Sequence, residues 1–143
     1  MKYFTSKWWS AGCNPEVFMQ YHEYFLSISS KLPAELCIFY QEHTLHDSKI
    51  ESINSNFSNN TISIILNGWD SDLNYPVKYE LSFKGVISFI QNLPLEDNRF
   101  GDLGYCEYDI IDSNTEMRML FDSDAQINII FNNFEFKSKP RKP

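Results

Sequence analysis

The sequence has little of what the common enzyme signatures require. Its five glycines are scattered and form neither a phosphate-binding loop nor a dinucleotide-binding fingerprint. Neither a GxSxG nucleophile motif nor an HExxH zinc motif occurs. The three cysteines, Cys13, Cys37 and Cys106, are widely spaced and form no CxxC pair, which predicts reduced, buried thiols instead of a disulfide framework. We therefore expect a protein that is not an enzyme and has no cofactor and no metal.

Long hydrophobic runs and basic residues are also scarce. No stretch reaches the roughly 20 apolar residues that a membrane span needs, and the first residues lack the apolar run of a signal peptide. The chain has 12 basic and 19 acidic residues, which gives a formal net charge of −7. An acidic chain repels nucleic acid and anionic lipid. The sequence therefore predicts a soluble, cytoplasmic protein whose partners include neither nucleic acid nor membrane.

The acidic residues are concentrated in one part of the chain. Nine acidic and two basic residues lie between Leu95 and Asp124, so this window carries a surplus as large as the net charge of the whole chain. The acidic residues are Glu96, Asp97, Asp102, Glu107, Asp109, Asp112, Glu116, Asp122 and Asp124. A concentrated negative field attracts cationic partners. The window favours a binding protein, and a solvated acidic face is the alternative interpretation of any single residue in it.

Two segments near the N-terminus have the pattern of helices. Asn14, Pro15 and Glu16 form a capping sequence, and the apolar residues that follow recur at helical spacing. This pattern predicts a helix over residues 14–30. A second proline-led start predicts a short helix over residues 33–42, although its apolar run is also compatible with a buried strand.

From residue 47 onward, apolar side chains alternate with polar ones, as in strands with one face in water. Val77–Lys84 is the clearest strand, and further candidates are 61–66, 105–111, 116–121, 126–131 and 134–136. The sequence therefore predicts an α+β fold, with one or two N-terminal helices packed on an antiparallel β-sheet meander of five to seven strands. We expect a single α+β domain over residues 1–136 and a basic flexible tail over residues 137–143.

Aromatic and acidic side chains occur together at two places that could bind a partner. On the predicted strand, Tyr105, Glu107 and Asp109 share one face. Tyrosine offers rigid contact area, and carboxylates can pair with Arg or Lys across an interface. The loop that begins at Trp69 repeats this chemistry. The full set of predicted partner-binding residues is Trp69, Asp70, Asp72, Tyr105, Glu107, Asp109, Asp112 and Glu116.

One short segment contains side chains that could bind a metal. His43, His46 and Asp47 would suit a small metal-dependent hydrolase. A catalytic zinc site needs three protein ligands, and each histidine ligand needs a hydrogen-bond partner that orients it. No downstream ligand pattern follows in the sequence. We favour the interpretation that Asp47 turns the chain into the first strand and that His46 packs nearby.

Four segments carry a resemblance to known proteins. They are Leu45-His46-Asp47-Ser48 with Ile50, Ile62-Ser63-Ile64-Ile65-Leu66, Tyr79-Glu80-Leu81-Ser82-Phe83-Lys84-Gly85-Val86, and Gly104-Tyr105-Cys106-Glu107-Tyr108. Their pattern resembles small bacterial proteins that include the immunity proteins of polymorphic toxin systems, such as contact-dependent growth inhibition. The likeness covers roughly residues 45 to 136 and is one of pattern, so it transfers no binding residue to this chain.

The resemblance implies a non-enzymatic immunity protein that binds and neutralises a cognate toxin domain of the basic, nuclease type. We expect the acidic aromatic surface to be its interface, because opposite fields can raise association rates to about 10⁸–10⁹ M⁻¹s⁻¹ at low salt. The alternative is an intracellular adaptor or structural protein-binding module, which could be homodimeric through an exposed sheet edge. The oligomeric state stays open, with a monomer favoured.

Overall fold

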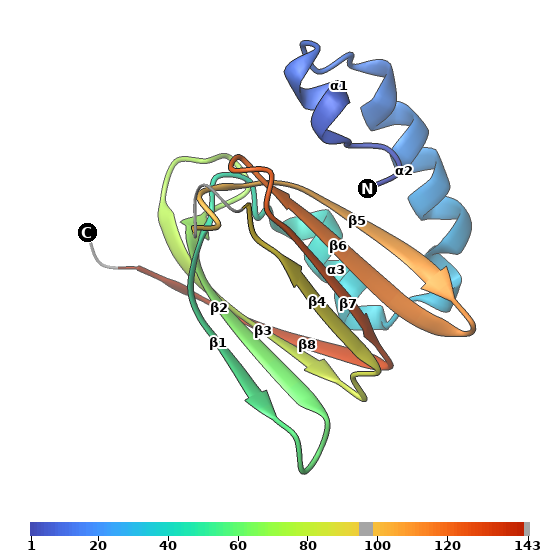
Figure 1. Cartoon of the computed structure of the whole chain (residues 1–143), viewed down its shortest axis with the longest axis vertical. Helices are drawn as coiled ribbons and strands as arrows, with labels where there is room; N and C mark the ends of the chain where they lie inside the picture. The colour runs from blue at the N-terminus through green and yellow to red at the C-terminus, as the bar shows by residue number, and fades with distance from the viewer. Residues whose placement is uncertain (95–98, 142–143) are drawn as a thin grey trace.

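The computed structural model describes residues 1–94 and 99–141, in which the strands form two four-stranded antiparallel sheets (Figure 1). One sheet has the strand order β1-β2-β3-β8, and the other has the order β4-β7-β6-β5. The strands are β1 (Lys49–Asn56), β2 (Thr61–Trp69), β3 (Pro76–Lys84), β4 (Ser88–Asn92), β5 (Leu103–Ile111), β6 (Asn114–Phe121), β7 (Gln126–Phe131) and β8 (Asn133–Pro140). The two sheets face each other as the layers of a sandwich.

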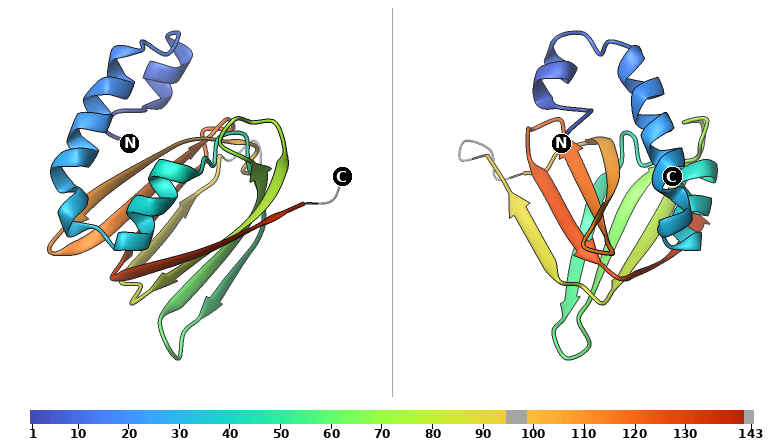
Figure 2. Two further views of the ribbon diagram at one scale, coloured as in Figure 1. Left: turned by 180° about the vertical axis from the view of Figure 1, so that it is seen from behind. Right: turned by 90° about the vertical axis from the view of Figure 1, so that its right-hand side faces the viewer.

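The helices precede the strands and lie along one side of the sandwich. They are α1 (Ser6–Ser10), α2 (Glu16–Ile28), a 3₁₀ turn (Ser29–Lys31) and α3 (Ala34–Glu42). Helix α2 contacts β5, and α3 contacts β8. The helices therefore cover the side of the sandwich on which the edge strands β5 and β8 lie, and they leave the side of β1 and β4 uncovered (Figures 1 and 2). None of the helices in the described part of the chain is long and apolar enough to cross a bilayer.

Alternating apolar side chains from both sheets form the core. They come mainly from four central strands and are Ile62, Ile64, Leu66, Tyr79, Leu81, Phe83, Met117, Met119, Phe121, Ile127, Ile129 and Phe131. Each strand contributes every second residue, because successive side chains point to opposite faces of a sheet. The alternation predicted for 61–66 and for Val77–Lys84 is confirmed by this burial.

The chain passes from the first sheet to the second at Gly85. This residue has a φ of 62°, and a Cβ atom there would lie 2.8 Å from the Cβ of Asn132, where the chain passes back from β7 to β8. Glycine suits the position because it adopts positive φ without strain and leaves room for the second crossing. The amide of Val86 donates to the carbonyl of Asn60 at 2.9 Å. This hydrogen bond fixes the tip of the β1–β2 hairpin next to the start of β4.

The predicted α+β class is confirmed. The described residues contain three helices and eight strands, and the strands form two sheets. The sequence had predicted one or two helices and a single meander of five to seven strands. Residues 126–131 form β7 with the predicted bounds, and the ambiguous segment at 33–42 contains helix α3. Helix α1 and strand β4 were not predicted. Both are only five residues long, which is too short for a clear hydrophobic period.

The prediction of a flexible tail from residue 137 is wrong for residues 137–140. These residues complete β8, which pairs with β3 along its whole length from Lys84↔Asn133 to Val77↔Pro140. The register places Lys137 opposite Glu80. The backbone of β3 offers hydrogen-bonding groups along this edge, so a strand forms even without apolar side chains. Residues 142–143 lie outside the part of the chain that the structure describes.

Candidate functional site

The carboxylates that were expected to form an accessible acidic face are inside the protein. Glu107, Asp109 and Glu116 are 0%, 4% and 8% exposed, and they surround Arg118, which is 4% exposed. The guanidinium donates to Glu107 from Nη2 at 2.9 Å, to Asp109 from Nη1 at 3.2 Å, and to Glu116. The expectation of an exposed acidic face on β5 and β6 is therefore wrong.

The N-terminal arm, residues 1–4, covers this charged cluster. The backbone amides of Lys2, Tyr3 and Phe4 all donate to the carboxylate of Glu107, at 2.8, 2.7 and 2.7 Å. The ammonium group of Lys2 lies 3.0 Å from Asp109. One buried carboxylate thus fixes the path of three consecutive residues, because a buried charge must be satisfied by donors close to it.

Hydrogen bonds keep the two β5 carboxylates ionised. Burial by itself would raise the pKa of Glu107, but donors from Lys2, Phe4, Arg118 and Tyr3 outweigh it and lower the pKa below its ordinary value. Burial acts in the same direction on Asp109, where donors led by the Tyr24 hydroxyl and the Lys2 ammonium lower the pKa to about 2. Burial likewise opposes the charge on Arg118, whose pKa is nevertheless raised by its carboxylate partners.

The other predicted partner-binding residues do not complete a single patch. Asp72 and Asp112 are exposed, whereas Trp69 and Asp70 are half-buried. The side chain of Asp70 accepts from the amides of Asn74 and Tyr75 within its own loop. This β2–β3 loop and the β5–β6 turn that contains Asp112 lie at different ends of the molecule (Figures 1 and 2). Two further acidic residues of the window, Glu96 and Asp97, lie outside the described residues.

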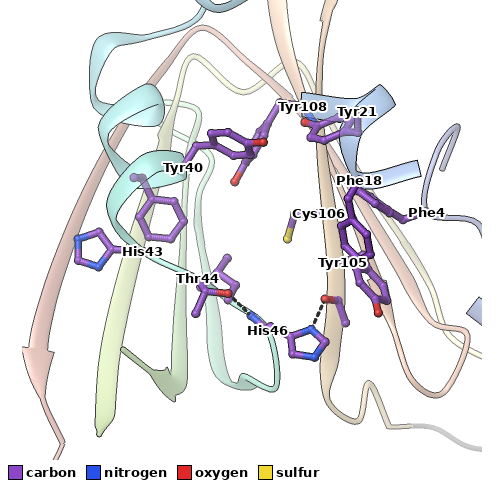
Figure 3. A pocket seen from close by; sticks show the side chains of 13 residues that line it. Phe4, Phe18, Tyr21, Tyr40, His43, Thr44, His46, Tyr105, Cys106 and Tyr108 are labelled. Carbon is purple, nitrogen blue, oxygen red and sulfur yellow. Dashed lines mark hydrogen bonds between the residues drawn. The ribbon is translucent and has the colours of Figure 1, made fainter. Parts of the chain in front are cut away.

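A cavity of about 510 Å³ lies between the helices and β5, and it is the best candidate for a functional site (Figure 3). Aromatic side chains supply most of its wall. Its lining residues are Phe4, Phe18, Tyr21, Phe39, Tyr40, His43, Thr44, Leu45, His46, Gly104, Tyr105, Cys106 and Tyr108. Several of them, including Phe18, which is 46% exposed, also reach the surface. A concave site of this size with a largely apolar lining is typical of a binding pocket.

Tyr105 lies at the centre of one wall of the cavity and contacts several other aromatic rings. Its ring stacks on Phe4, with ring centroids 5.3 Å apart, and meets the edges of Trp8 and Trp9 at 5.0 and 4.9 Å. Gly104 makes the approach of Trp9 possible, since a Cβ atom there would lie 2.3 Å from the indole ring. Phe4 stands in this wall because Glu107 holds its amide. The buried charges thereby position the cavity without lining it.

The thiol of Cys106 and the tyrosine hydroxyls of the cavity are held uncharged. The thiol of Cys106 points into the space between Tyr40 and Tyr105 (Figure 3). Burial, with a smaller contribution from the charge of Glu107, raises the pKa of Cys106 to about 12. Burial and a contact with Cys13 raise the pKa of Tyr105 to about 12, and burial raises that of Tyr40. The cavity therefore offers neutral thiol and hydroxyl groups among aromatic rings.

The two histidines of the proposed metal segment are turned to different partners. Nδ1 of His46 lies 2.7 Å from the carbonyl of Gly104, and Nε2 lies 3.6 Å from Asp47. His43 stacks on Phe39 and lies 3.5 Å from the hydroxyl of Tyr79. Within residues 1–94 and 99–141, no group of three or more His, Cys, Asp or Glu side chains is placed to hold a metal ion. The expected packing of His46 next to the turn at Asp47 is observed.

Of the residues in this cavity, sequence reasoning placed Tyr105 among the partner-binding residues and considered His43 and His46 only as metal ligands. It missed Phe4, Tyr40, Cys106 and Tyr108, which come from three separate segments. A usable signal was present for the charged cluster. Arg118 is the one cation on β6, and antiparallel pairing sets it directly opposite Glu107, so an internal ion pair could have been expected from the strand register.

Comparison with curated proteins finds no match to this chain. The comparisons also provide no link to the immunity proteins of toxin systems, and the resemblance to them stays a prediction. A family profile does match residues 7–131, which span α2, α3, β1 to β7 and all of α1 except its first residue. The chain belongs to the family described as "Protein of unknown function (DUF4085)".

Proposed function

We propose that this chain is a non-enzymatic binding protein that neutralises a protein toxin in the cytoplasm by enclosing an apolar side chain of the toxin. The observation that carries the proposal is the aromatic cavity between the helices and β5. Aromatic anchors that fill pockets supply much of the affinity of protein interfaces. The free state of all three cysteines supports a reducing compartment.

The shifted pKa values of Cys106, Tyr105 and Asp109 favour a binding role for these groups over acid–base catalysis. A general acid or base works best when its pKa lies near the working pH. Here the pKa values of Cys106 and Tyr105 are both raised to about 12, and that of nearby Asp109 is lowered to about 2. These shifts move the groups away from neutral pH. Such a lining suits recognition of an uncharged group.

Two further observations support a toxin as the partner. The sequence pattern of residues 45 to 136 resembles that of immunity proteins, and the net charge of −7 would speed the approach of a basic protein. Since Glu107, Asp109 and Glu116 are internal, we assign this charge a steering role and assign the contact itself to the cavity.

The test uses the polypeptide encoded by the reading frame next to this one, which we propose to be the toxin fragment. Purified wild-type chain should capture it. Cys106→Leu places extra volume in the cavity, because the thiol points into it, and we expect at least a tenfold loss of affinity. Cys37→Leu is the matched control, since Cys37 lies on α3 outside the cavity lining and should retain wild-type affinity.

Each possible failure has a separate meaning. If the wild-type chain does not bind the fragment, toxin neutralisation is wrong. If the fragment binds Cys106→Leu as tightly as wild type, and circular dichroism shows both proteins folded, the cavity is not the contact.

A further inference from the structure

The side of the sandwich away from the helices has two open strand edges. Strands β1 and β4 are each the outermost strand of their sheet, and no other strand of the described residues pairs with their outer edges. Helices α3 and α2 lie against the edge strands at the opposite side, β8 and β5. An open edge presents unpaired backbone N–H and C=O groups that can pair with another strand.

A groove of about 600 Å³ lies between these two edges, and apolar and uncharged polar residues line it in about equal measure. Its lining includes Ile53 from β1, Phe57 from the hairpin tip, and Ile87 and Phe89 around β4. Ile53 and Phe89 belong to the half-buried shell of the core, whereas Phe57 and Ile87 are 90% and 63% exposed. None of the residues that line the groove is charged. The groove therefore offers uncharged side chains between two open strand edges.

The usual protection of strand edges is missing along the groove. Proteins discourage pairing at an edge with lysine, proline or a bulge. Strand β4 has no charged residue and no proline. Strand β1 has Lys49, Glu51 and a bulge between Ile50 and Ser52, but all of these lie in its first half. The second half, which borders the groove, has none of them.

We propose that this groove binds an extended, uncharged segment of a partner polypeptide, which adds a strand to the edge of β4. Main-chain hydrogen bonds to the edge would supply affinity, and alternate apolar side chains of the segment would contact Ile53, Ile87 and Phe89. The proposal does not rest on toxin neutralisation, because the groove and the aromatic cavity have no lining residue in common.

Charge decides between a partner and a second copy of this chain. Two copies with a net charge of −7 each repel one another as they approach. A neutral segment of a different protein meets no such repulsion, and the uncharged lining offers nothing that would favour a charged segment.

The test measures binding of a neutral peptide with the sequence Ser-Thr-Val-Thr-Val-Thr-Val-Ser, which carries an uncharged fluorophore and an amidated C-terminus, to the full chain by fluorescence anisotropy. We expect saturable binding, and Ile87→Lys should weaken it at least tenfold by placing a charge in the groove. Two matched controls should bind the peptide as wild type does. Ile38→Lys is on helix α3, and Ile90→Lys is on β4 but outside the groove lining.

Hydrogen–deuterium exchange gives a second readout that does not depend on a substitution. Bound peptide should slow exchange in segments 49–56 and 86–92. Absence of saturable binding up to about 1 mM, the weak end of specific affinities, would overturn the proposal, as would equal binding by Ile87→Lys. Sedimentation that shows a homodimer abolished by Ile87→Lys would also overturn it, because a second copy would then be the occupant.

Discussion

The two sides of this sandwich treat their strand edges in opposite ways. At the helical side, the N-terminal arm lies over β5, and the buried β5 carboxylates of Glu107 and Asp109 hold the arm. At the other side, the edges of β1 and β4 border a groove whose lining carries no charge. Two carboxylates of the acidic window thus hold the N-terminal arm against β5, whereas the residues that line the groove are uncharged.

Charge density along the sequence therefore does not locate charge on the surface of this protein. The acidic window contains three carboxylates, those of Glu107, Asp109 and Glu116, that share the internal guanidinium of Arg118. Burying several charges is costly unless they are paired and hydrogen-bonded. We call the helical side the closed side and the side of β1 and β4 the open side. Single substitutions on the closed side should therefore lower the stability of the fold strongly, and those on the open side should change it little.

The largest effect is expected for Arg118→Met, which leaves Glu107, Asp109 and Glu116 buried without their shared cation. We expect a loss of about 3–5 kcal/mol in the free energy of unfolding, measured by urea denaturation. Lys84→Met is the matched control, because it removes an exposed pair with Glu135 and should cost about 0–1 kcal/mol. Equal losses in the two variants would contradict the contrast between buried and exposed pairs.

The second-largest effect is expected from acid, which should lower the free energy of unfolding through the carboxylates of the closed side. The pKa of Asp109 is lowered from 3.8 to about 2, and that of Glu107 is lowered from 4.5. The unfolded chain therefore takes up protons before the folded chain does. The stabilisation is complete above about pH 4.5 and is lost as the pH falls towards about 2. Urea denaturation across this window should show the decline, and Asp109→Asn should flatten it, while Asp72→Asn should leave the slope unchanged.

Tyr24→Phe should have an intermediate effect. The Tyr24 hydroxyl donates to Asp109 and helps to lower the pKa of that carboxylate. Loss of a hydrogen bond to a charged group costs about 1.5 kcal/mol or more, and thermal or urea unfolding should detect this loss. Tyr75→Phe serves as control because Tyr75 is 71% exposed, and its stability should match wild type.

The smallest effect on stability is expected on the open side. Phe57 is 90% exposed at the hairpin tip, so Phe57→Lys should change the free energy of unfolding by no more than about 0.5 kcal/mol. The same variant should bind the neutral peptide more weakly than wild type. A destabilisation as large as that of Tyr24→Phe would show that the open side also supports the fold.

Local sequence patterns predicted the elements whose contacts follow a regular period. The alternation in β2 and β3 located the buried faces correctly, and the shared face of Tyr105, Glu107 and Asp109 was also correct. What covers that face could not be predicted in this way. The arm that does so lies about 100 residues away in sequence, and no periodic pattern records a contact at that separation.

The cavity was unpredictable for the same reason. Its wall combines residues from the N-terminal arm, α2, α3, the segment 43–46 and β5. Each aromatic residue, such as Tyr40 or Tyr108, fits a helix or strand core equally well when it is considered alone. Only the packing of these segments against one another separates a cavity wall from a filled core.

The most direct measurement compares Cys106→Leu with Asp112→Asn in calorimetric titrations against the polypeptide encoded by the neighbouring reading frame. Cys106 lines the cavity, whereas Asp112 is an exposed acidic residue outside the cavity lining. If the cavity is the contact, Cys106→Leu should lower the affinity at least tenfold and Asp112→Asn should bind as wild type does. Retained affinity in Cys106→Leu together with a loss in Asp112→Asn would contradict this assignment.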